Sequence, residues 1–144
     1  MGNFINSTTL IPLIPFVTSL FIFILLVSFN RTLNRLTKPV TALVSLSLLS
    51  SAFISSFDYF KKIEKDLVLS ELFKFFEEIN LVIHLNLVNE KIIIFFSLIM
   101  MLIIGISFYK IPRKKGYVSL MISLGLISSS VILSILLIDF SALI

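Results

Sequence analysis

The sequence predicts an all-α membrane protein with four transmembrane helices in a single membrane domain, residues 1–144. Three observations predict this fold class: the composition, four long uncharged stretches, and the charge pattern of the loops between them. Hydrophobic residues make up 58% of the chain and charged residues 14%, and the mean hydropathy is +1.11. Because a soluble domain needs more charge than this to cover its surface, the composition favours an integral membrane protein.

The four predicted spans are residues 10–28, 40–57, 92–109 and 116–138. Eighteen helical residues at about 1.5 Å each cover roughly 27 Å, close to a hydrocarbon core of about 30 Å. None of the spans contains Asp, Glu, Lys, Arg or His. Ion and proton carriers place such residues at mid-membrane, so the sequence argues against autonomous transport.

Prolines mark the beginnings of the first two predicted helices. Pro12 and Pro15 fall in the opening turns of the first span, where a missing backbone N–H costs least. Pro39 directly precedes the second span and is well placed as its first helical residue.

The loop charges predict the orientation of the chain. Loop 30–39 has three basic residues and no acid, and loop 110–115 has four basic residues and no acid, whereas loop 58–91 has five lysines and seven acids. Basic loops stay on the cytoplasmic side, so loops 30–39 and 110–115 are predicted to be cytoplasmic. Both termini and loop 58–91 are then expected outside.

Loop 58–91 is expected to contain two elements of its own. Leu69, Leu72, Phe73 and Phe76 recur at helical spacing and predict an amphipathic helix on the membrane surface or on a partner. From residue 79 to residue 88 the hydrophobic period is two, which predicts a short β-strand. A single strand is unstable, so it needs a partner in this loop or on another subunit.

Serines recur every four residues on two of the predicted helices. The second helix has Ser47, Ser51 and Ser55, and the fourth has the pairs Ser119 and Ser123, and Ser130 and Ser134. Small residues at this spacing let helices approach closely and form hydrogen bonds, so we expect both faces to pack against other helices. The alternative is that each serine bonds back to its own helix.

The sequence predicts no catalytic, cofactor-binding or metal-binding residue. His84 is the only histidine and has no acid spaced to orient it, so a structural or solvent-facing role is favoured over catalysis. Glu77 and Glu78 are expected on a solvated helix face. The chain has no cysteine, no phosphate-binding glycine loop and no nucleophile elbow. Its basic residues flank apolar spans, which topology explains better than nucleic acid does.

Two motifs in the first 39 residues carry a family resemblance. LIPLIP at residues 10–15 and FNRTLNRLTKP at residues 29–39 resemble the opening of subunit 5 of NAD(P)H–quinone oxidoreductase, an antiporter-like membrane subunit of complex I and of the cyanobacterial NDH-type complex. IHL at residues 83–85 and KKGYVSLMISLGLISSS at residues 114–130 resemble segments before the third and fourth helices of that family. The resemblance implies an N-terminus outside, quinone-linked electron transport and proton translocation, and a thylakoid or plasma membrane.

The chain also departs from that family. The proton path of the family uses a Glu in a WELVG-like segment of its fifth helix, which would come after residue 144, and Asn89 stands where the family has the acid of a VDxLS-like turn. No proton-transfer residue is therefore carried over. The expectation is a short or truncated homologue that serves as a scaffold or accessory element among other membrane subunits of an NDH-type complex.

Other functions are also consistent with these patterns. The chain could be a stand-alone membrane interaction or regulatory protein derived from that family, or a component of an inorganic-carbon uptake system, since some relatives of the family serve carbon uptake. A pore former of the holin type ranks last, because holins usually carry a charged cytoplasmic tail and this C-terminus is apolar.

Overall fold

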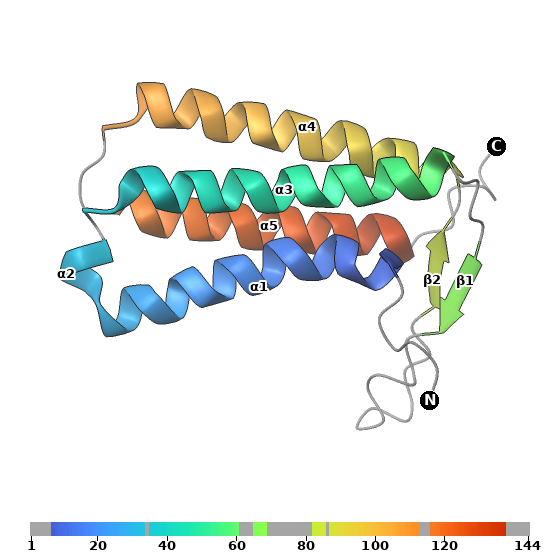
Figure 1. The fold of residues 1–144 in the computed structure, drawn as a ribbon, viewed down its shortest axis with the longest axis horizontal. Coiled ribbons are helices and arrows are strands. Elements are labelled where there is room, and N and C mark those ends of the chain that lie inside the picture. Colours follow the sequence, from blue (N-terminus) through green and yellow to red (C-terminus); the bar gives the residue numbers. More distant parts are fainter. Residues whose placement is uncertain are drawn as a thin grey trace.

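Four long helices form a bundle with a small β-sheet at one end (Figure 1). The computed structural model describes residues 7–33, 35–60, 65–68, 82–85, 87–112 and 116–137. The elements in chain order are α1 (Ser7–Ser28), α2 (Asn30–Leu33), α3 (Thr37–Phe60), β1 (Lys65–Val68), β2 (Val82–Leu85), α4 (Leu87–Lys110) and α5 (Tyr117–Leu137).

The four long helices run up and down along one axis, and their connections alternate between the two ends of the bundle. The short helix α2 and the α4–α5 connection lie at one end, which we call the loop end (Figure 1). The strands β1 and β2 lie at the other end, the sheet end, where α1 begins and α5 ends (Figure 1). The two basic loops therefore share one end of the molecule.

All four helices are long and apolar enough to cross a membrane, which confirms the predicted number of such helices. Their bounds differ from the predicted spans mainly at the sheet end. α3 continues to Phe60, three residues past the predicted limit, and α4 begins at Leu87, five residues before it. The helices therefore contain Asp58 and Glu90, which the sequence analysis assigned to a loop.

The sheet is an antiparallel pair of four-residue strands. β1 and β2 are in a register that pairs Lys65 with Leu85 and Asp66 with His84. β2 lies within the stretch 79–88 whose period of two predicts a strand, but Leu87 and Val88 belong to α4 instead. The amphipathic helix expected around residues 69–76, together with Glu77 and Glu78, lies outside the described residues.

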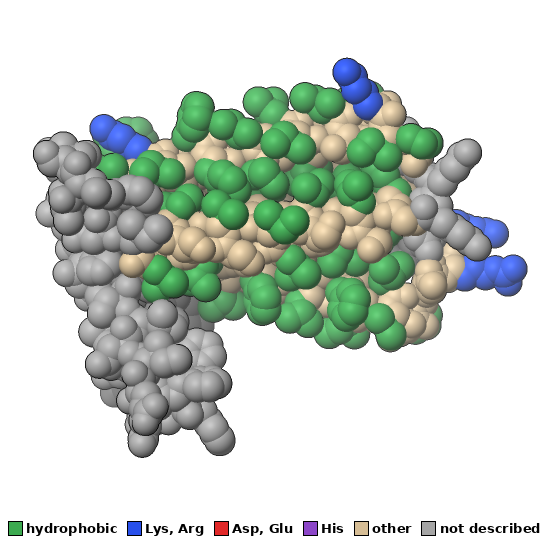
Figure 2. All heavy atoms as spheres, turned by 180° about the vertical axis from the view of Figure 1, so that it is seen from behind, with side chains coloured by type: hydrophobic (Ala, Val, Ile, Leu, Met, Phe, Trp, Pro, Cys, Tyr) green, Lys and Arg blue, Asp and Glu red, His purple; other side chains and the backbone are tan. Residues whose placement is uncertain are grey.

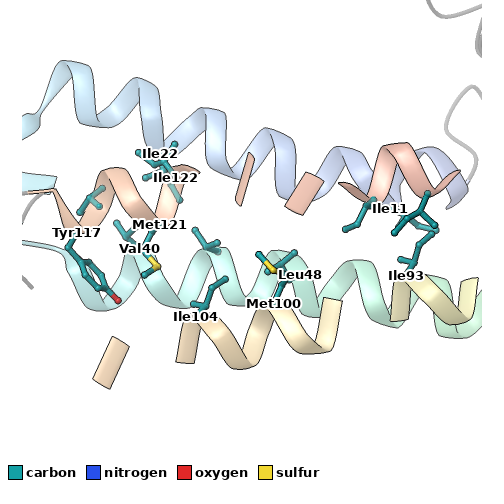
Figure 3. Close-up of a cluster of buried hydrophobic side chains, with 14 of the residues drawn as sticks. Ile11, Ile22, Val40, Leu48, Ile93, Met100, Ile104, Tyr117, Met121 and Ile122 are labelled. Carbon is teal, nitrogen blue, oxygen red and sulfur yellow. The ribbon is translucent and has the colours of Figure 1, made fainter. Parts of the chain in front are cut away.

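The core lies between the four helices and is built from aliphatic side chains. Leu48 of α3 and Met100 of α4 point into the same region near the middle of the bundle, while Ile22 of α1 lies next to Ile122 of α5 (Figure 3). α3 and α5 bury a larger share of their residues than α1 and α4 do. α3 and α5 each pack against all three other long helices.

The outward faces of the helices are predominantly apolar. Exposed large hydrophobic side chains occur on all four, for example Phe21 on α1, Phe53 on α3, Phe95 on α4 and Ile127 on α5. Figure 2 shows this surface from behind: hydrophobic side chains cover the bundle, and Lys and Arg side chains are visible only toward its ends. This distribution suits contact with lipid along the middle and with water at both ends.

Candidate functional site: the interhelical polar seam

Four hydrogen bonds between described residues join one long helix to another through a polar side chain, and we call this set the polar seam. They are Ser51 to the carbonyl of Ile11, Ser55 to the carbonyl of Glu90, Asn89 to the carbonyl of Ile135, and Thr41 with Tyr117. In order, these bonds join α3 to α1, α3 to α4, α4 to α5, and α3 to α5. Hydrogen bonds of this kind stabilise helix association in a membrane, where burial of apolar surface contributes little.

The bond from Ser51 satisfies a carbonyl group that a proline leaves without its helical partner. In a helix the carbonyl of Ile11 would accept the backbone N–H of residue 15, but residue 15 is proline and has none. The hydroxyl of Ser51 donates to this carbonyl at 2.7 Å, and both residues are fully buried. Prolines are tolerated in membrane helices when a neighbouring Ser or Thr satisfies the freed backbone group.

This contact corrects the expected role of Pro15. Because α1 begins at Ser7, Pro15 is the ninth residue of the helix and not part of its opening turn. The missing N–H therefore falls in the helix interior, where it would be costly without a substitute donor. Ser51 of α3 and Pro15 of α1 are therefore linked through the carbonyl of Ile11.

At the sheet end, Asn89 caps the final turn of α5. Its side-chain N–H donates to the carbonyl of Ile135 at 3.2 Å. Ile135 lies two residues before the last residue of α5, so its carbonyl is one of the four that have no partner within the helix. Nearby, the hydroxyl of Ser55 donates to the carbonyl of Glu90 at 3.2 Å. The first turn of α4 is thus bonded to both α3 and α5.

Two carboxyl groups are buried at this end of the bundle. Asp58 is 1% exposed and Glu90 is 0% exposed. Both residues lie outside the predicted uncharged spans, but the helices extend past those spans and bury the two carboxyl groups. Glu90 lies in the first turn of α4, where the helix dipole favours a negative charge, whereas Asp58 lies near the end of α3, where it does not.

Helical spacing is the signal that could have located these acids. Asp58 follows Ser55 by three residues and so continues the face of Ser47, Ser51 and Ser55. Glu90 likewise precedes the buried Ile93 by three residues on α4. A change from apolar to charged residues suggested that the spans end before these positions, but the buried faces continue through them.

A close approach between three helices occurs at Gly125 of α5. A Cβ atom at this position would collide with the hydroxyl of Ser19 on α1 and would lie 3.5 Å from Cγ1 of Val44 on α3. Ser19 is fully buried and donates to the carbonyl of Pro15 at 2.7 Å. Gly125 thus allows α1, α3 and α5 to meet near the middle of the bundle, which is the usual role of small residues at such crossings.

At the loop end, Thr41 and Tyr117 join α3 to α5. Their hydroxyl oxygens are 3.0 Å apart, and Thr41 also donates to the carbonyl of Thr37 at 2.8 Å. Because a hydroxyl has a single hydrogen, Tyr117 is the donor in the bond between the two side chains. Tyr117 is buried, and its polar end is therefore satisfied within the protein.

The expected serine packing holds for one helix and fails for the other. Ser47, Ser51 and Ser55 of α3 are buried, and Ser51 and Ser55 bond to other helices, whereas Ser47 donates to the carbonyl of Val44 on its own helix. On α5 the predicted serines are exposed, and three of them donate back to carbonyls of their own helix: Ser123, Ser130 and Ser134. The small residues of α5 that do pack inside the bundle are Gly125, Ser128 and Ser129.

Within the described part of the chain, no group of three or more His, Asp or Glu side chains is placed to hold a metal ion. His84 is in β2, and its register partner in β1 is Asp66, an acid that sequence spacing alone did not place beside it. Ser97 of α4 is buried, and among the described residues its hydroxyl has no hydrogen-bond partner.

Compared with known proteins, the chain matches no family model, no curated protein and no solved structure.

Proposed function

We propose that this protein is a membrane scaffold or accessory subunit, which contributes a rigid four-helix unit to a larger membrane assembly. The observation that carries the proposal is the polar seam, whose four bonds include contacts from α3 to each of the other long helices. In lipid such bonds fix which helices are neighbours and in what register. A unit with fixed helix positions suits a role in holding other subunits in place.

The resemblance of residues 10–15 and 29–39 to subunit 5 of NAD(P)H–quinone oxidoreductase identifies the proposed assembly. It is an NDH-type complex that couples quinone-linked electron transport to proton translocation, in a thylakoid or plasma membrane. In this proposal the chain contributes structure to the complex, and the redox and proton-transfer steps belong to other subunits.

Co-purification tests the assembly. The tagged protein is extracted from its native membrane in a mild detergent, and the proteins that remain bound are identified by mass spectrometry. NDH-type subunits are expected to be enriched. Their absence would remove the proposed assembly, and capture of a different set of membrane proteins would favour the stand-alone interaction or regulatory role, or the role in carbon uptake.

A matched pair of glycine variants links the assembly to the bundle. Gly125→Ala introduces a collision at the helix crossing, whereas Gly105→Ala of α4 adds a Cβ with no atom within 4 Å. At equal amounts of membrane-inserted protein, G125A is expected to recover fewer NDH-type subunits than G105A does. Equal recovery would mean that the packing of the bundle does not matter to the assembly.

The proposed orientation puts loops 30–39 and 110–115 in the cytoplasm and both termini outside. It is supported by the seven basic residues of these two loops and by the location of both loops at one end of the bundle (Figure 1). Reporters fused after Lys38 and Lys115 should indicate the cytoplasm, and a reporter fused after Glu78 should indicate the outside. The reverse pattern would contradict the orientation.

A further inference from the structure

We infer that the loop end of the bundle binds the headgroups of anionic phospholipids in preference to neutral ones. The relevant surface consists of the exposed side chains of Arg31, Arg35, Lys38 and Lys110, which we call the basic end. Arg31 lies in α2 and Arg35 just after it, Lys38 is in the first turn of α3, and Lys110 is the last residue of α4, so all four are at the loop end (Figure 1).

The charge of the basic end is not balanced by acids in the described structure. The only described acidic residues inside helices are Asp58 and Glu90, and both are at the sheet end. Among the described residues, the loop end has four cationic side chains and no carboxylate. Such a cluster beside membrane helices attracts negative charge in the surrounding leaflet.

The backbone that carries these cations is held by hydrogen bonds. The N–H of Thr32 donates to the carbonyl of Phe29, and the N–H of Arg35 donates to that of Thr32, each at 3.1 Å. On the other connection, the N–H of Ile111 donates to the carbonyl of Ser107 at 2.9 Å and extends the last turn of α4. The cations are therefore presented from ordered turns, which lowers the entropy lost when they bind a headgroup.

Apolar side chains beside the cations favour a lipid over a soluble anion. Phe29 is 61% exposed, Leu36 is 46% exposed and Tyr109 is 86% exposed. Each is adjacent in the chain to one of the four cations, or separated from it by one residue. A phospholipid presents a phosphate next to acyl chains, so it can contact the cationic and the apolar side chains at the same time. Inorganic phosphate can contact only the cationic side chains.

The sheet end provides the contrast. Lys91 is exposed at this end, and its Nζ lies 5.5 Å from the ring centroid of Tyr59. The buried carboxyls Asp58 and Glu90 are at the same end of the bundle. We therefore expect the preference for anionic lipid in the leaflet around the loop end, whichever face of the membrane that is, and independently of any NDH-type complex.

Lipid retention tests the inference with a matched control. The full chain is reconstituted in vesicles of equal parts phosphatidylcholine and phosphatidylglycerol, extracted in detergent, and its retained lipids are quantified by mass spectrometry. The wild type should be enriched in phosphatidylglycerol. In the variant R31Q/R35Q/K38Q/K110Q this enrichment should fall by a factor of at least about five. A factor of about five corresponds to the attraction of one basic residue to an anionic surface. K91Q should retain it.

A second measurement uses only the wild type and does not depend on the folding of the variant. The midpoint of thermal unfolding in neutral detergent should rise on addition of phosphatidylglycerol and should not rise with the same amount of inorganic phosphate. Three results would overturn the inference: no enrichment in the wild type, equal loss in K91Q and the fourfold variant, or equal stabilisation by free phosphate.

Discussion

The hydroxyl of Ser51 donates a hydrogen bond to the carbonyl of Ile11, forty residues earlier in the chain. This carbonyl is the one whose helical N–H is missing, because Pro15 occupies the donor position. One side chain of α3 thus satisfies a polar group in the interior of α1 and fixes the register of the two helices. In lipid no water is present to replace this donor, so loss of the Ser51 hydroxyl leaves the carbonyl of Ile11 without a partner while Pro15 is present.

Ser51→Ala should destabilise the bundle by about 1 kcal/mol, because a buried carbonyl loses its donor. The measurement is unfolding of the purified protein in mixed detergent micelles. Ser45→Ala is the control, since Ser45 is exposed and donates to the carbonyl of Ala42 on its own helix. The double variant P15A/S51A should recover part of the loss, because an alanine at position 15 restores the backbone N–H that bonds to the carbonyl of Ile11. A loss in S51A that is unchanged by P15A would contradict this explanation.

Asn89→Asp should destabilise the protein by about 1–3 kcal/mol, because a carboxylate cannot donate to the carbonyl of Ile135 and repels it. Asn89→Ala removes the donor without adding charge and should cost less. Unfolding measured at falling pH tests whether the lost donor and the added charge cause this destabilisation. Once the introduced carboxyl is protonated, it has an O–H to donate and no charge. The destabilisation of N89D should therefore shrink toward zero at low pH. A cost that is independent of pH would mean that the side-chain amide is not the relevant donor.

Gly125→Ala should destabilise the bundle by about 1–3 kcal/mol, since α1 and α5 must separate to admit the methyl group. Gly105→Ala is the internal comparison and should be neutral or slightly stabilising, because its methyl meets no atom and alanine is the better helix former. Replacing Ser19 by alanine removes the hydroxyl that collides and should rescue part of the loss in G125A. Equal thermal stability of G125A and G105A would rule out the close crossing.

Tyr117→Phe should lower the stability by about 0.6 kcal/mol, the average value for a side-chain hydrogen bond between membrane helices. Thr41→Val removes the same bond from the other side, and the double variant should cost less than the sum of the two single changes. The coupling energy from this double-mutant cycle reports the bond between the two hydroxyls directly. Additive costs would show that the two residues stabilise the helices independently.

Hydrophobicity by itself determined much of the fold. Long uncharged stretches have to form helices in lipid, because every backbone polar group must find a partner within the segment. Four such helices were predicted and the described residues contain four, and the two basic loops lie at one end, as alternation along the chain requires. The serine face of α3 was also readable from its spacing, since residues four apart share a helix face.

The sequence was misleading at positions where a charged residue is buried inside a helix. Asp58 and Glu90 mark the edges of the uncharged stretches, but the helices continue through both residues and bury them. A side chain at the end of a span is solvated or buried according to the helix that packs over it, and local composition does not contain that information. The serines of α5 fail for the same reason: two faces of that helix carry small residues, and packing selects the face with Gly125, Ser128 and Ser129.

The sequence alone therefore determined a membrane protein with four helices, connected by two basic loops and one mixed loop, because hydropathy and charge act on each segment independently of the others. Only the tertiary structure decided which polar side chain meets which carbonyl: Ser51 with Ile11, and Asn89 with Ile135. These pairs join residues 40 and 46 positions apart in the chain, so they depend on the rotation and register of packed helices. No periodicity within a single helix encodes those two quantities.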